Sequence, residues 1–211
     1  TTSGTVVSAD DNVGVNSAGK PTVNGRTSTK AWNELAESLA EAWVTNDASV
    51  LKQLSVADKK KLLKNAINMV EKTNGNSKTK RQLRSSAFSV AFAVASSLPK
   101  SRSTKTLIKN AHQALLAVAQ SESHPRLQKH MVRLLCDKGY QKKLSRADKA
   151  DVKDLFEATF PQKFDVGNIL DSDGYIQWEH NIDQGENMFR SFILNVRQTA
   201  IGGQKFKFQS K

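Results

Sequence analysis

Apolar residues recur along most of the chain at steps of three and four, the spacing that places side chains on one face of an α-helix. The clearest stripe follows Ser28 and Thr29, either of which can cap a helix, and it consists of Trp32, Leu35, Ala36, Leu39, Ala40 and Trp43. Similar patterns predict seven or so helices in all. The second predicted helix is short and ends near residue 54. The others cover about 55–70, 81–98, 104–118, 124–139, 144–160 and 183–201.

The two ends of the chain lack this spacing. Residues 1–27 are rich in Gly, Ser, Thr, Asn and Asp, and residues 202–211 open with two glycines and then alternate Lys and Phe. We therefore expect an all-α fold with minimal strand content, in which a single helical domain of one or two lobes spans residues 28–201. Extended N- and C-terminal arms, 1–27 and 202–211, would flank it. The alternative for residues 1–27 is that they pack against their own domain.

The C-terminal arm offers a candidate contact between subunits. Strict alternation in residues 204–209 gives one charged and one apolar edge, and Phe206 and Phe208 lie on the apolar edge. We expect these two side chains to dock into a neighbouring copy and to support a homo-oligomer.

Two segments share a helix start. Leu54-Ser55-Val56-Ala57-Asp58-Lys59 and Leu144-Ser145-Arg146-Ala147-Asp148-Lys149 both place a serine three residues before an aspartate, which approximates a capping box. The pair indicates either an internal duplication at about ninety residues or two independent helix starts that use the same favourable residues.

The amino-acid composition limits the classes of partner that the protein is expected to bind. The chain has 211 residues with a net charge of +12, a balance that favours nucleic acid or another polyanion. One cysteine, Cys136, excludes an internal disulfide framework, and no apolar run approaches the ~20 residues of a membrane span. We expect no membrane partner and no small-molecule substrate, and a cytoplasmic or virion location.

The positive charge is concentrated in a stretch from Lys72 to Ser121 that contains no Asp or Glu. Its cations form two groups on either side of the apolar, small-residue run 87–95, which predicts a buried helix with basic ends. Further along the chain, Arg126, Lys129 and Arg133 recur at steps of three and four, and His130 lies beside them. This spacing predicts a basic stripe on the helix over 124–139. The predicted nucleic-acid-binding residues are Lys78, Lys80, Arg81, Arg84, Lys100, Arg102, Lys105, Arg126, Lys129 and Arg133.

Motifs for metal binding and catalysis are incomplete or missing. In 171–176, placing Gly174 at position 6 of a calcium-binding EF-hand loop puts Ile169 at position 1 and His180 at position 12, so both end ligands are lost. His124, His130 and Cys136 are spaced by six residues, which turns successive side chains away from one another on a helix and disfavours a zinc site. No catalytic or nucleotide-binding motif stands out. We expect a protein without cofactor or metal that is not an enzyme.

These patterns lead to two hypotheses. The first is a structural protein that coats nucleic acid, RNA rather than DNA, in the manner of a viral nucleocapsid or filament coat. It would bind the phosphate backbone without sequence specificity and assemble through its terminal arms. This hypothesis is an analogy at the level of architecture. The alternative is a helical protein-interaction module, a regulator or effector, that binds an acidic protein.

Overall fold

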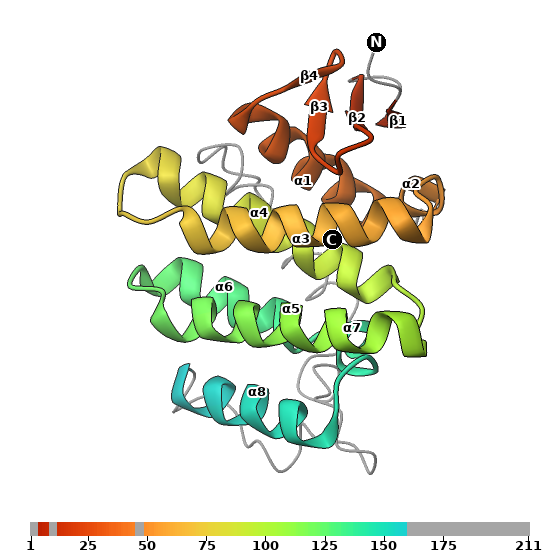
Figure 1. Ribbon diagram of the computed structural model, residues 1–211. Coiled ribbons are helices and arrows are strands. Elements are labelled where there is room, and N and C mark those ends of the chain that lie inside the picture. Colours follow the sequence, from red (N-terminus) through yellow and green to blue (C-terminus); the bar gives the residue numbers. More distant parts are fainter. Residues whose placement is uncertain (1–3, 9–11, 45–48, 160–211) are drawn as a thin grey trace, which may run out of the picture.

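Figure 1 shows the computed structural model, which describes residues 4–8, 12–44 and 49–159. The described chain is mostly helical, as the sequence predicts, with a small antiparallel sheet at its start. The predicted helix over 183–201 and the C-terminal arm with Phe206 and Phe208 lie outside the described residues. The helices are α1 (Thr29–Val44), α2 (Ser49–Lys52), α3 (Val56–Lys72), α4 (Lys78–Ser97), α5 (Arg102–Ser121), α6 (Pro125–Leu135), α7 (Lys138–Gln141) and α8 (Arg146–Thr159).

The described residues of the N-terminal segment, 5–8 and 12–27, differ from the expected extended arm. They form four short strands, β1 (Thr5–Ser8), β2 (Val13–Val15), β3 (Pro21–Val23) and β4 (Arg26–Thr27), paired in sequence order as an antiparallel meander. Strands of two to four residues are too short for a period-two pattern to be visible in the sequence. Asn24 and Gly25 both have positive φ and join β3 to β4, and Asn-Gly is the favoured pair for such a tight hairpin.

The sheet belongs to the same core as the helices. Val7, Val13 and Val15 are buried in one cluster with Trp32 and Leu35 of α1. The turn between β2 and β3 contacts α3. Asn65 Nδ2 of α3 donates to the carbonyl oxygens of Ala18 (2.9 Å) and Gly19 (2.8 Å). The alternative expectation, that this segment packs on its own domain, is therefore the one that the structure supports.

Helix α4 is the centre of the fold. Every residue from Arg84 to Ala95 is buried, and α4 packs against α1, α3, α5 and α6. The alternation of Ala and Ser with Phe88, Val90 and Phe92 lets neighbouring helices approach closely while filling the core. The predicted buried helix is confirmed. Figure 1 shows the surrounding elements in successive layers, from the sheet at one end to α8 at the other.

Several helix ends follow the sequence. Ser55 Oγ accepts from Asp58 N, and Ser145 Oγ accepts from Asp148 N, each at 3.1 Å, so both predicted caps are confirmed. The predicted end of the sixth helix at Gly139 is wrong. Helix α6 ends at Leu135, and Gly139 lies inside α7, because Asp137 starts a new short helix by accepting from Tyr140 N with its Oδ2 atom.

No helix in the described part of the chain is long and apolar enough to span a membrane.

Candidate nucleic-acid interface

The predicted basic residues of the acid-free stretch lie near the two opposite ends of helix α4. Lys78, Lys80 and Arg81 begin α4, whereas Lys100 and Arg102 follow its far end. Helix α4 has 20 residues, which at 1.5 Å per residue makes it about 30 Å long. The expected single basic centre is therefore divided by the length of a buried helix.

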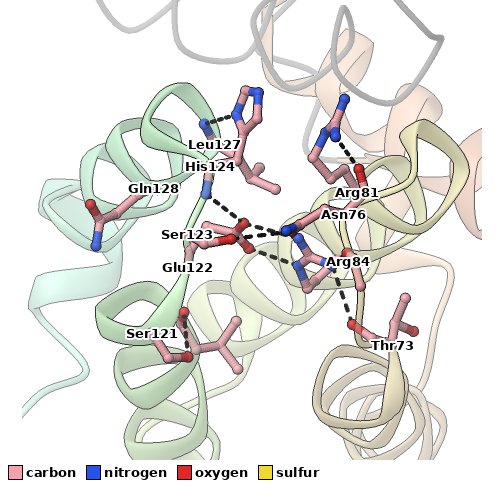
Figure 2. Close-up of polar contacts among 12 residues, drawn as sticks. Thr73, Asn76, Arg81, Arg84, Ser121, Glu122, Ser123, His124, Leu127 and Gln128 are labelled. Carbon is pink, nitrogen blue, oxygen red and sulfur yellow. Dashed lines mark hydrogen bonds and ion pairs between the residues drawn. The ribbon is translucent and has the colours of Figure 1, made fainter.

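The start of α6 lies at the same end as the start of α4. Ser123 Oγ, just before α6, donates to Asn76 Oδ1 in the turn before α4 over 3.1 Å. Figure 2 shows these two turns facing each other. This contact brings the start of α6, whose first turn includes Arg126, close to the start of α4. We call Lys78, Lys80, Arg81 and Arg126 the first basic surface; all are exposed except Arg81, which is half-buried and donates to the Asn76 carbonyl.

Arg84 lies beneath this surface and has a different role from the predicted one. Its Nε and Nη2 atoms donate to the two carboxylate oxygens of Glu122 at 2.7 and 2.9 Å, a bidentate ion pair between two buried residues. Its Nη1 atom donates to the carbonyl oxygens of Thr73 and Gly75. With its charge neutralised and its donors engaged inside the protein, Arg84 is not placed to contact a phosphate, and the geometry does not support this predicted site residue.

The Arg84–Glu122 pair joins the turn after α3 to the turn after α5. Glu122 Oε1 also accepts from His124 N at 3.2 Å, so the carboxylate organises the entry into α6 as well (Figure 2). Above the pair lies a cleft of about 440 Å³ between the two turns, lined by residues such as Asn74, Gly75 and Ser121. A Cβ atom on Gly75 would lie 2.9 Å from Lys80 Cδ, so the Lys80 stem packs against Gly75, one of the residues that line this cleft.

Comparisons of this chain with protein-family models, with curated proteins and with solved structures find no match. The case for an interface therefore rests on geometry and charge.

The first turns of three successive helices have an unusual charge. Helices α4, α5 and α6 carry cations there, and none of the three has an acidic residue in its first turn. A helix N-terminus bears a partial positive charge and free N–H groups, so a cation near it is unfavourable by about 0.3–1 kcal/mol and an anion is favourable. Bound anions would remove this repulsion at all three starts.

Most of the predicted cations reach solvent. Lys78, Lys80, Lys100, Arg102, Lys105, Arg126 and Lys129 are exposed. Within the described residues, the ion pairs with carboxylates at 4 Å or less are formed by Lys30, Arg84 and Lys153. Lys78, Lys80 and Arg126 form none of them. The charge of the first basic surface is thus available to an external anion.

The predicted stripe on α6 is only partly at the surface. Arg126 and Lys129 are exposed and Arg133 is half-buried, but His130 is 4% exposed. Burial, together with repulsion from Arg133 and Arg126, lowers the pKa of His130 to about 3. Burial also lowers the pKa of Arg133. His130 therefore belongs to the core, since the face of α6 that it shares with Leu127 and Leu134 packs inward.

The described residues contain no group of three or more His, Cys, Asp or Glu that could hold a metal ion. Cys136 is buried, and burial raises the pKa of its thiol well above the usual value. His112 Nδ1 lies 2.7 Å from the Tyr140 hydroxyl, where both side chains are fully buried, and the Tyr140 ring packs against Phe92. This pair lies in the core between α5 and α7 and is a structural contact.

Glu122 is the residue of this region that sequence reasoning missed. It is the first carboxylate after the acid-free stretch, and it lies 38 residues from its partner Arg84. A carboxylate that interrupts a long basic segment just before a helix start was the available signal. Pattern alone could not pair it with Arg84, because that choice depends on how α5 folds back along α4.

Proposed function

We propose that the protein coats single-stranded nucleic acid, RNA in particular, as the structural protein of a nucleocapsid or filament does. The observation that carries this proposal is the charge at the starts of α4, α5 and α6, which present exposed cations and no acid in the first turn. Such sites attract phosphate groups by charge and by hydrogen bonding together.

Binding of this kind does not depend on base sequence. Lysine and arginine contacts to backbone phosphates position a strand but carry no base information. Affinity should therefore be similar for unrelated sequences and should depend strongly on salt.

Assembly is the second part of the proposal. Phe206 and Phe208 lie outside the described residues and remain the predicted contact with a neighbouring subunit. Burial of one Phe side chain contributes on the order of 2 kcal/mol. Deletion of residues 204–211 is expected to reduce the size of assemblies formed with RNA more than it reduces the stability of the protein. Normal assembly of the truncated protein would contradict this part and leave the binding proposal in place.

Fluorescence anisotropy with labelled RNA tests the binding proposal. If about six phosphates are contacted, the logarithm of the association constant should fall with the logarithm of salt concentration with a slope near −4 for a single strand. Two unrelated 20-nucleotide sequences should give the same slope. No binding at low salt, or a flat salt response, would rule the proposal out.

The alternative partner, an acidic protein, makes a different prediction. Size-exclusion chromatography before and after nuclease treatment distinguishes the two. A coating protein should elute with nucleic acid as large species that shrink after nuclease, whereas an interaction module should elute as a monomer or dimer with a protein-like absorbance ratio.

A further inference from the structure

A second group of cations lies at the opposite end of α4 from the first basic surface. Lys100, in the turn after α4, has its Nζ atom 3.5 Å from the carbonyl oxygen of Lys142, which follows α7. Residues 100 and 142 are far apart in sequence, and the packing of α7 against α4 brings them together. Figure 1 shows that the turn after α4 and helix α7 lie on the same side of the molecule.

Lys143 adds a third cation to this group, because it follows Lys142 directly. Lys100 and Lys142 are exposed and Lys143 is half-buried. We call Lys100, Lys142 and Lys143 the second basic surface. Lys59, in the first turn of α3, is buried and is not part of this surface; burial lowers its pKa, and repulsion from Lys143 lowers it further.

The three lysines of the second basic surface are not neutralised within the described chain. None of them is within ion-pair distance of a carboxylate of the described residues. The start of α5 adjoins them in sequence and contributes Arg102 and Lys105, again without an acid in its first turn. Closely spaced cations without counter-charges repel one another, and a bound polyanion relieves that repulsion.

We propose that the second basic surface is a separate phosphate-binding site, and that one nucleic-acid strand runs along α5 and contacts both basic surfaces. This inference rests on the proposed function, because it takes the ligand to be a nucleic-acid backbone. Its new content is the participation of Lys142 and Lys143, and the requirement for a strand long enough to reach both ends.

Helix α5 provides the connecting path. It runs back from the turn after α4 toward the start of α6 (Figure 1). It ends at Ser121, and the next residue, Glu122, has its carboxylate buried with Arg84. None of its residues from Arg102 to Ser121 is acidic, and its exposed side chains include Lys109, Gln113 and Gln120. A strand along α5 therefore meets no carboxylate from this helix.

The length of this path sets the length of the ligand. With 20 residues, α5 is about 30 Å long. A stacked single strand advances about 3.4 Å per nucleotide, so roughly nine nucleotides are needed to reach both surfaces. A stacked strand of five nucleotides is about 17 Å long and can contact only one surface at a time.

The test measures the salt dependence of binding for labelled oligouridylates of 5 and 20 nucleotides. The decisive variant is Lys142→Gln with Lys143→Gln, and the matched control is Lys20→Gln with Lys30→Gln, which removes the same charge from exposed positions near the sheet. Each lost phosphate contact reduces the slope by about 0.7, so the decisive variant should lose about 1.4 with the 20-nucleotide strand. The control should keep the slope of the original protein.

The two strand lengths test the bridging claim. In the original protein the 20-nucleotide strand should have a steeper salt slope than the 5-nucleotide strand, because it contacts both surfaces. Equal slopes for the two lengths would overturn bridging, and an unchanged slope in Lys142→Gln/Lys143→Gln would overturn the second site. Either result would leave the proposed function standing. Absence of RNA binding by the original protein would contradict the proposed function and the second site together.

A folding check keeps the test decisive. Circular dichroism and thermal unfolding should be unchanged in Lys142→Gln/Lys143→Gln, since Lys142 is exposed and Lys143 half-buried. If that variant does not fold, Lys100→Gln replaces it. Lys100 is exposed in the turn after α4, and the slope lost on its substitution should be about 0.7.

Discussion

Arg84 and Glu122 form a buried bidentate ion pair across 38 residues of sequence, with the Arg84 Nε atom 2.7 Å from Glu122 Oε2. The pair joins the turn between α3 and α4 to the turn between α5 and α6, and so fixes how the two helical hairpins meet. It also lies directly beneath the first basic surface. A basic residue predicted to bind phosphate thus positions the elements that carry the surface cations.

Removing one member of this pair should be strongly destabilising. Glu122→Leu or Arg84→Met leaves the other charge buried and unpaired, and the expected loss is about 3–5 kcal/mol in the free energy of unfolding. The double variant should recover much of that loss, because no buried charge remains. Urea unfolding of the two single variants and the double variant measures the coupling.

The exposed pair Lys30–Glu34 is the matched control. Its atoms are 3.9 Å apart, and the Lys30 side chain is 77% exposed. Lys30→Ala should cost no more than about 0.5 kcal/mol. Losses of similar size for Lys30→Ala and Arg84→Met would contradict the role assigned to the buried pair.

Two glycines test how the N-terminal sheet is held. Gly19 has φ +76°, and a Cβ atom there would lie 2.5 Å from Lys61 Cβ and 2.7 Å from the Lys61 carbonyl carbon. Gly19→Ala should therefore cost the left-handed backbone penalty of about 1–2 kcal/mol and a further ~1–3 kcal/mol for overpacking against α3. Gly25 has φ +73° with nothing within 4 Å of the same position, so Gly25→Ala should cost only the backbone term.

Chemical denaturation of these two alanine variants provides the comparison. The difference in the free energy of unfolding between them isolates the contact of the sheet with α3. Equal losses would mean that the turn between β2 and β3 does not press on Lys61.

The burial of His130 should make the free energy of unfolding decrease in mild acid. Its ring nitrogens have no hydrogen-bond partner within the described residues, and burial with repulsion from Arg133 and Arg126 lowers its pKa from 6.5 to about 3. The unfolded chain takes up a proton below pH 6.5, whereas the folded chain does not until about pH 3. The contribution of His130 is therefore present above pH 6.5 and is lost as the pH falls toward 3, at up to about 1.4 kcal/mol per pH unit.

His130→Leu should flatten this dependence, as measured by urea unfolding at a series of pH values from about 7 to about 4. Met131→Leu, at a fully buried neighbour without a titrating group, should keep the original dependence. His112, whose pKa is also lowered by burial, acts in the same direction, so some acid sensitivity should remain. An identical pH dependence in His130→Leu and the original protein would contradict the assignment.

Surface and buried cations should respond differently in RNA binding. Lys78→Gln with Lys80→Gln removes two exposed charges, and the salt slope should fall by about 1.4 while the free energy of unfolding changes by less than about 0.5 kcal/mol. Arg84→Met should instead lower stability. Anisotropy and unfolding of the same samples separate the two effects.

Lys20→Gln with Lys30→Gln serves again as the control of equal charge. If Lys78→Gln/Lys80→Gln retains the original affinity, binding would have to use other cations, those of α6 (Arg126, Lys129 and Arg133) or those of the second basic surface. That result would also remove the start of α4 from the proposed interface.

The sequence alone determined the local features. The stripe that includes Trp32 and Leu35 predicts α1, the small-residue run around Phe88 predicts a buried helix, and Ser55 and Ser145 predict two helix starts. These predictions succeed because helix periodicity and capping depend on residues within four positions of one another. The excess of cations and their clustering along the chain are likewise properties of the sequence itself.

Only the tertiary structure decided where those charges lie and what each one does. Arg84 and Arg81 are one helical turn apart, yet the first is buried against Glu122 and the second is half-buried at the surface, because α5 folds back along α4 and delivers a carboxylate to one of them. The grouping of Lys100 with Lys142, and the pairing of strands too short to show a period, likewise depend on contacts between distant segments. Such contacts are selected by packing and charge in three dimensions, and local spacing does not encode them.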